Sequence, residues 1–225
     1  FSYDDETWTQ YTELDVLPSN AVTAGFVDEH NNKWFATWGG GVVLFDGSTW
    51  SVIDTDDGLP TNLTYDVNRD KRGNYWFALD TGVVKYADGA VAEYYTEDDG
   101  LVFHRVYDIA VGSDNNLWFG ACKGMSLFDH TEFTNYYDHD DELVHYRVRD
   151  IVFDPWGVSW IATGGGVNMF DGETFVAYEP VDGVAGYETY CATRDNHGNY
   201  WFGSEGGLTR IQPDQPSCPS SGVSL

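Results

Sequence analysis

The chain of 225 residues has 37 acidic and 11 basic residues and a formal net charge of −26 at pH 7. So acidic a surface excludes nucleic acid and anionic membrane surfaces as partners, because both need a basic face. No apolar run is long enough to span a bilayer, so we expect no membrane insertion. The charge is typical of a protein that stays soluble in a salty or extracellular setting, and cation binding by some carboxylates is the alternative.

A tryptophan-centred segment recurs along the chain with steps of 42, 42, 42 and 41 residues. A period of about 40 to 45 residues with strand-like units is typical of propeller blades. Five copies fill residues 1–213 as a single domain, and the Pro/Ser-rich residues 214–225 are predicted to be a linker or an extension. The leading tryptophans of the copies are Trp34, Trp76, Trp118, Trp160 and Trp201.

Within one unit, four short runs rich in β-branched and aromatic residues alternate with Gly/Asp/Asn turns. In the second unit these runs are residues 63–69, 75–79, 83–87 and 90–96, which predicts four antiparallel strands per blade. An aspartate opens the turn between the first and second strands of four units, where its side chain can cap its own backbone. These residues are Asp28, Asp70, Asp154 and Asp195.

The last unit ends after its third strand, whereas a strand-like segment with Trp8 and Tyr11 lies one period before Trp50. We therefore predict that the N-terminal strand completes the fifth blade and removes an open sheet edge. The expected fold is an all-β, closed, five-bladed propeller of four-stranded antiparallel blades.

Loops from the fourth strand of one unit to the first strand of the next are predicted to surround the mouth of the central channel. They span residues 13–20, 54–62, 96–104, 139–146 and 180–187. One aspartate occupies the same position in every loop, and capping of the loop backbone is its favoured role. A calcium ion bound by these carboxylates is the alternative cofactor. The five residues are Asp15, Asp57, Asp99, Asp141 and Asp182.

The ends of these loops differ from blade to blade, as binding residues on a rigid scaffold do. Their aromatic, imidazole and guanidinium groups can stack on a sugar or hold a carboxylate, and filling gaps between blades is the alternative. The candidate ligand-binding residues are Asn62, His104, Arg105, Tyr146, Arg147 and Tyr187. A shared first-strand aspartate near the channel could hold water or a cation. The aspartates are Asp66, Asp108 and Asp150. Trp38 and Trp156 fall outside the repeat, and for both we expect a surface role.

Cys122, Cys191 and Cys218 have no metal-site spacing, and an odd number leaves at least one thiol free or paired with another chain. A free cysteine in the Pro/Ser tail would suit a self-assembling subunit.

The fullest copy of the repeat combines Trp34, Phe-Asp-Gly at 45–47, Trp50 and Asp-Gly-Leu-Pro at 57–60. This pattern resembles the two-component-regulator propeller repeat over residues 7–213. The resemblance implies a sensor or ligand-binding propeller of the kind found in the periplasmic part of hybrid histidine kinases and in free-standing secreted propellers. The motif is specific for the repeat and says less about function.

Three functions follow. The favoured one is a non-enzymatic binding module, extracellular, at the cell surface or periplasmic, that binds a glycan or a small carboxylate-bearing molecule at the channel mouth. The second is a structural subunit that binds copies of itself through its tail and free cysteine. The third is a lyase, because some lyases use propellers with His and Tyr near the axis. A binding protein is favoured over an enzyme because no G-x-S-x-G motif or Ser/His/Asp set is present.

Overall fold

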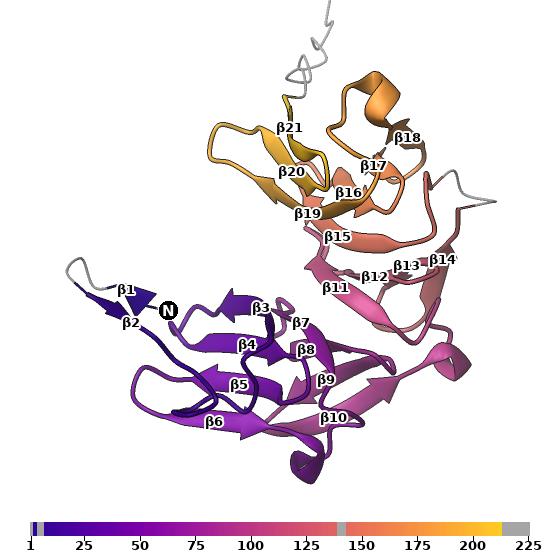
Figure 1. Ribbon diagram of the computed structural model, residues 1–225. Coiled ribbons are helices and arrows are strands. Elements are labelled where there is room, and N and C mark those ends of the chain that lie inside the picture. Colours follow the sequence, from indigo (N-terminus) through magenta and orange to yellow (C-terminus); the bar gives the residue numbers. More distant parts are fainter. Residues whose placement is uncertain (1, 4–6, 139–142, 213–225) are drawn as a thin grey trace, which may run out of the picture.

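The computed structural model describes residues 2–3, 7–138 and 143–212. Over these residues the chain forms five successive antiparallel sheets, here called blades 1 to 5 (Figure 1). Blade 1 contains β3 (Val22–Val27), β4 (Lys33–Thr37), β5 (Gly41–Phe45) and β6 (Trp50–Ile53); blade 2 contains β7 (Thr64–Arg69), β8 (Tyr75–Leu79), β9 (Val83–Ala87) and β10 (Ala90–Tyr95). Blade 3 contains β11 (Val106–Val111), β12 (Leu117–Ala121), β13 (Gly124–Phe128) and β14 (Phe133–Tyr136); blade 4 contains β15 (Val148–Phe153), β16 (Ser159–Thr163), β17 (Gly166–Phe170) and β18 (Phe175–Tyr178). Blade 5 contains β19 (Thr189–Arg194), β20 (Tyr200–Ser204) and β21 (Gly207–Ile211).

The predicted repeat of four antiparallel strands is confirmed in blades 1 to 4. The first strands of neighbouring blades contact one another in the order β3, β7, β11, β15, β19, so they lie along the inner side of an arc. Short 3-10 turns form in three of the connecting loops, at Thr55–Asp57, Glu97–Asp99 and Pro180–Asp182. No helix in the described ranges has the length and apolar character needed to cross a membrane.

Each turn aspartate organises the hairpin that it opens. Asp70 accepts the backbone N–H groups of Arg72 and Asn74, the side-chain amide of Asn74, and the indole N–H of Trp76 at 3.1 Å. Asp28 and Asp195 bind the same set of groups in their own blades. The predicted backbone cap is therefore confirmed, also at Asp154, which accepts two backbone N–H groups. In Asp28, Asp70 and Asp195 the same carboxylate also positions the leading tryptophan, which the sequence did not indicate.

Four apolar clusters hold the arc together, one between each pair of neighbouring blades. In the first cluster Trp34 and Val42 of blade 1 pack against Phe77 and Leu79 of blade 2. Equivalent positions meet in the other three interfaces, for example Trp160 against Phe202 with ring centroids 6.1 Å apart. Because one sheet face of each blade needs the next blade to cover it, the core is divided among the interfaces.

The predicted closure by the N-terminal strand is wrong in the described part of the chain. Blade 5 has three strands there, and β2 (Trp8–Thr9) pairs with β1 (Ser2–Tyr3) instead of β21. The ring of Tyr11 packs on Trp50 of blade 1, with centroids 5.1 Å apart. Packing between blades sets the angle between them, and at this angle five blades leave the arc open between blade 1 and blade 5 (Figure 1). The N-terminal segment therefore covers the nearest apolar surface, which is the outer face of blade 1.

Candidate functional site

The repeated loop aspartates cap their own loops. In four loops the carboxylate accepts the backbone N–H group three residues earlier, at 2.9–3.2 Å, and the glycine that follows Asp57, Asp99 and Asp182 has a φ between 101° and 106°. The capping role favoured from the sequence is thus observed for Asp15, Asp57, Asp99 and Asp182, and Asp141 lies outside the described residues. Among the residues that the structure describes, no three His, Cys, Asp or Glu side chains are placed to share a metal ion.

Two of the candidate ligand-binding residues close their own loops, and a third, Tyr187, is held through its backbone. The amide oxygen of Asn62 accepts the backbone N–H of Thr55 at 3.0 Å. The imidazole Nδ1 of His104 lies 2.7 Å from Glu97 Oε1, and the same oxygen accepts the His104 backbone N–H. The Tyr187 backbone N–H is bound by Glu205, while its ring is 54% exposed. Asn62 and His104 therefore stabilise loops, whereas Tyr187 still offers a ring.

The arginines gather where the loops meet the first strands. Arg147 and Arg149 both bind the carboxylate of Glu188, at 3.3 and 3.0 Å. Arg147 also lies over the ring of Tyr146, 5.9 Å from its centroid. Two guanidinium groups share one carboxylate, so this part of an acidic protein carries a local excess of positive charge.

Every first strand has a β-bulge next to this region. The pairing with the second strand shifts between residues 22 and 24, 64 and 66, 106 and 108, 148 and 150, and 189 and 191. A bulge leaves one residue out of the ladder and re-aims its side chain, and bulges are frequent beside functional sites. The bulged residues are Thr23, Tyr65, Tyr107, Arg149 and Tyr190.

Four of these side chains and one tryptophan form a continuous series that we call the mouth arc. Trp38 meets Tyr65 edge to face at 5.0 Å, and Tyr65 meets Tyr107 in the same way at 5.3 Å. The guanidinium of Arg149 lies 5.7 Å from the Tyr107 centroid and 5.4 Å from that of Tyr190. The mouth arc is therefore a row of aromatic faces with one cation set into it, from blade 1 to blade 5.

Sequence reasoning identified Trp38 as a surface residue but missed the other four members of the mouth arc. They stand directly before the first-strand aspartate position, where three blades carry a tyrosine and one carries an arginine, and this recurrence of large polar side chains is the signal that could have revealed them. Candidate Arg105 belongs here too, because the pKa of Arg105 is raised by the Tyr65 and Tyr107 phenol groups beside it. Burial raises the pKa of both Tyr65 and Tyr107, and hydrogen bonding to Cys122 adds to the effect on Tyr107, so both phenols remain neutral.

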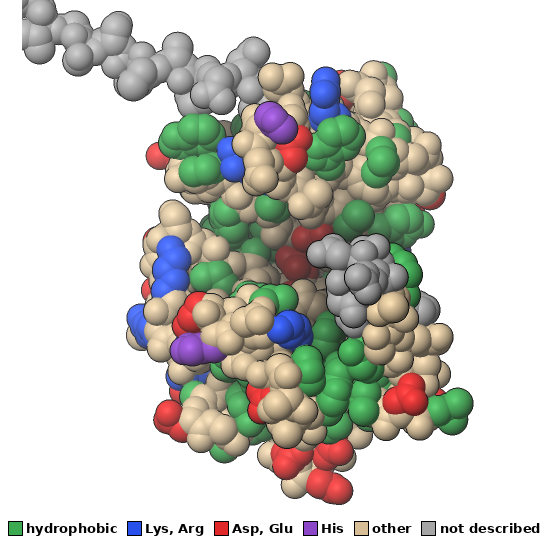
Figure 2. Space-filling view, turned by 90° about the vertical axis from the view of Figure 1, so that its left-hand side faces the viewer, with side chains coloured by type: hydrophobic (Ala, Val, Ile, Leu, Met, Phe, Trp, Pro, Cys, Tyr) green, Lys and Arg blue, Asp and Glu red, His purple; other side chains and the backbone are tan. Residues whose placement is uncertain are grey.

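Below the mouth arc, the first-strand aspartates of blades 2, 3 and 4 each tie their blade to the next. The carboxylates of Asp66, Asp108 and Asp150 accept the backbone N–H groups of Ile109, Ile151 and Ala192 at 2.8–2.9 Å. They line a channel cavity of about 400 Å³, and Figure 2 shows acidic side chains recessed in the hollow between the two ends of the arc.

This environment disfavours ionisation of the three carboxyl groups. Burial raises the pKa of Asp66 to about 7 and that of Asp150 to about 6. Burial, followed by the charges of its two neighbours, holds the pKa of Asp108 well above its usual range. These aspartates act first as links between blades.

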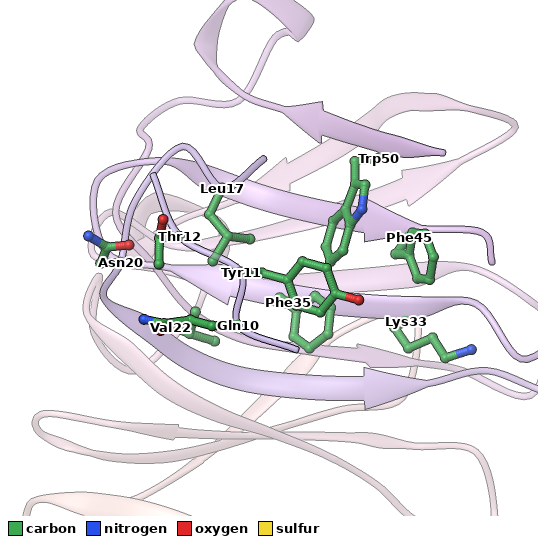
Figure 3. Close-up of a pocket in the computed structure, with 10 residues that line it drawn as sticks. All are labelled: Gln10, Tyr11, Thr12, Leu17, Asn20, Val22, Lys33, Phe35, Phe45 and Trp50. Carbon is green, nitrogen blue, oxygen red and sulfur yellow. The ribbon is translucent and has the colours of Figure 1, made fainter. Parts of the chain in front are cut away.

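A second cavity, of about 580 Å³, lies on the outer face of blade 1 and is lined mainly by apolar side chains (Figure 3). Tyr11 and Leu17 of the N-terminal segment cover one side of it, and Phe35, Phe45 and Trp50 form the other. It contains no member of the mouth arc.

Neither protein-family models nor curated proteins match this chain. Among solved structures, the extracellular domain of the hybrid two-component system BT3049 from B. thetaiotaomicron is similar with a TM-score of 0.74 and 20% identity over 88% of this chain and 34% of that one. Virginiamycin B lyase from Staphylococcus aureus, solved with quinupristin, has a TM-score of 0.70 and 14% identity over 87% of this chain and 69% of its own. PorZ, a surface component of the type-IX secretion system of Porphyromonas gingivalis, has a TM-score of 0.68 and 17% identity over 94% of this chain and 34% of its own.

These likenesses establish the β-propeller fold. The chain spans about a third of the length of the BT3049 and PorZ structures.

Proposed function

We propose that the chain is a non-enzymatic, extracytoplasmic binding module whose mouth arc holds a carboxylate-bearing glycan or a similar small carboxylate. The observation that carries the proposal is the placement of Arg149 between the rings of Tyr107 and Tyr190 on bulged first strands. Aromatic faces bind the apolar faces of sugars, and a guanidinium fork binds a carboxylate through two parallel hydrogen bonds.

Local charge supports an anionic ligand in spite of the net charge of −26. The two positive charges of Arg147 and Arg149 exceed the single negative charge of Glu188. Arg105 lies beside the neutral phenol groups of the mouth arc. Glu188 already holds the guanidinium groups of Arg147 and Arg149 in place. A ligand carboxylate at this point would therefore meet donors that need little further ordering, which lowers the cost of binding.

The two imidazoles of the neighbouring loops favour binding over catalysis. His104 is bound to Glu97, and Nδ1 of His145 accepts the backbone N–H of Arg147 at 3.1 Å. Both are engaged in loop structure, so neither is free to act as a general acid or base without leaving it. The fold shared with virginiamycin B lyase does not by itself imply its activity.

An extracytoplasmic location is part of the proposal. It is supported by the acidity of the chain and by its likeness in fold to an extracellular sensor domain and a bacterial surface component. Assembly with copies of itself through Cys218 and residues 214–225 remains the alternative, and both lie outside the described residues.

Isothermal titration with oligogalacturonate and with its neutral methyl ester tests the proposal. We expect the acid to bind and the ester to bind at least about tenfold more weakly. Arg149→Ala should abolish the preference, and Arg149→Lys should restore part of it, because lysine keeps the charge but loses the fork. Arg72→Ala, which removes an exposed arginine from the opposite turn of blade 2, is the matched control. Equal effects of the Arg72 and Arg149 changes would contradict a site at the mouth arc.

A further inference from the structure

The face of blade 1 that points away from blade 2 is more exposed than the corresponding face of blades 2 to 5. Its second-strand residue Phe35 is partly exposed, whereas the equivalent residues of blades 2 to 5 are fully buried. Those residues are Phe77, Phe119, Ile161 and Phe202. On the first strand, Val22 is 46% exposed, while Thr64, Val106, Val148 and Thr189 at its position are at 0%.

The face of blade 5 that points away from blade 4 is likewise more exposed than the corresponding face of blades 1 to 4. Leu208 is 74% exposed, although the residues at its position in blades 1 to 4 are all at 0%. Those residues are Val42, Val83, Met125 and Val167. Trp201 is also partly exposed, in contrast to the buried Trp34, Trp76, Trp118 and Trp160. Both ends of the arc thus present the apolar positions that elsewhere hold two blades together.

Every interface inside the arc shows what covers such a face, because in all four clusters the partner is the neighbouring blade. The chain covers 69% of virginiamycin B lyase. Five blades would be about this share of a propeller with about seven blades. We propose that each of the two end faces binds a further blade, and that a segment of two such repeats closes the ring. This inference does not depend on the ligand of the mouth arc.

The N-terminal segment supports this proposal. By the repeat, Trp8 and Tyr11 stand where fourth strands carry Trp50 and Ile53. In the part of the chain that the structure describes, however, β2 pairs with β1 and with no strand of a blade. The segment covers the face of blade 1 loosely, since the cavity of about 580 Å³ remains beneath it (Figure 3). In a closed ring, the added segment would first supply the missing fourth strand of blade 5. It would then form a complete sixth blade and the first three strands of a seventh blade. The N-terminal segment would supply the fourth strand of that seventh blade.

A second copy of the chain does not fit as the occupant. The two end faces border one gap, which in a ring of about seven blades has room for two. Another arc would bring five blades to this gap, so it could cover one end face but could not enter between both.

The test replaces residues 213–225 by a copy of residues 88–171, which begins with a fourth strand and ends with a third. We expect the extended protein to be monomeric, to melt roughly 10 °C or more above the 225-residue chain, and to bind less of a hydrophobic dye. Leu208→Glu should remove most of that gain in the extended protein. Val181→Glu, at a loop residue that is 85% exposed, is the matched control and should leave the gain intact.

The 225-residue chain provides an independent check that does not require the extended protein to fold. Because Leu208 is exposed in it, Leu208→Glu should leave its melting temperature unchanged. A drop of several degrees would mean that Leu208 is already covered and would overturn the proposal. Dimers of the 225-residue chain that Leu208→Glu dissociates, or an extended protein that folds with an unchanged melting temperature, would also overturn it.

Discussion

Aspartates at the first turns of the blades and aspartates at the axis belong to the same repeat, but their surroundings shift their ionisation in opposite directions. Burial raises the pKa of Asp70, but the hydrogen bonds from Asn74 and Trp76 outweigh it, and the net pKa is lowered. Burial is the largest influence on Asp66, which faces other carboxyl groups and accepts fewer N–H groups, and its pKa rises to about 7. The balance between burial and the number of donors around a carboxylate therefore decides whether the fold favours its charge.

This difference has opposite consequences for stability against pH. A carboxyl whose pKa is lowered in the folded state, such as Asp28 or Asp70, stabilises the fold above pH 4 or so and loses that effect as the pH falls. A carboxyl whose pKa is raised, such as Asp66 or Asp150, binds its proton more tightly in the folded state. Its contribution is lost as the pH rises from about 4 to about 7. We therefore expect maximal stability in mildly acid solution, between the two ranges.

The largest effect is expected from Asp70→Ala. It removes the acceptor of the buried Trp76 indole together with two backbone caps, and the free energy of unfolding should fall by about 2–4 kcal/mol. Asp154→Ala is the matched comparison, since Asp154 accepts two backbone N–H groups, from Trp156 and Val158. Its loss should be about half as large or smaller. Urea unfolding at pH 7 measures both, and equal losses would show that the tryptophan bond adds nothing.

A smaller effect of the opposite sign is expected at the axis. Asp66→Asn keeps an oxygen for the Ile109 N–H but cannot ionise. At pH 8 it should stabilise the protein by about 1–2 kcal/mol, and at pH 5 it should change little, because Asp66 is then already protonated in the folded state. Asp56→Asn, which removes one charge from an exposed loop position, is the control for net charge. If both variants stabilise equally at pH 8, relief of net charge explains the effect and burial does not.

Local capping could be predicted from the sequence, because the partners lie within a few residues. The backbone cap of Asp70 involves Arg72 and Asn74, and the loop cap of Asp57 involves Asp54. The blade repeat could be predicted as well, since it depends on the spacing of the tryptophans. Neither depends on how the blades are arranged around the axis.

Features that join separate blades could not be predicted in this way. Asp66 binds Ile109, 43 residues away, and the members of the mouth arc meet only because each first strand bulges at one residue. Closure by the N-terminal strand failed for a related reason. Counting strands shows which one is missing, but the angle between blades comes from side-chain packing in the interfaces, which a repeat pattern does not specify.

The smallest effect is expected in a pH titration of the unmodified protein, in which the carboxyl ¹³C signals of its aspartates report their pKa values. Asp46 accepts hydrogen bonds from Thr49 and Ser48, which lower its pKa, so its signal should show no midpoint between pH 3 and pH 8. Asp150 should titrate near pH 6 and Asp66 near pH 7. Because the axial carboxyl groups interact, their curves should be broad and should shift together when Asp108 is changed to Asn. Axial signals with midpoints near pH 4, indistinguishable from those of exposed aspartates, would show that the axis is solvated and would remove the contrast with the turns.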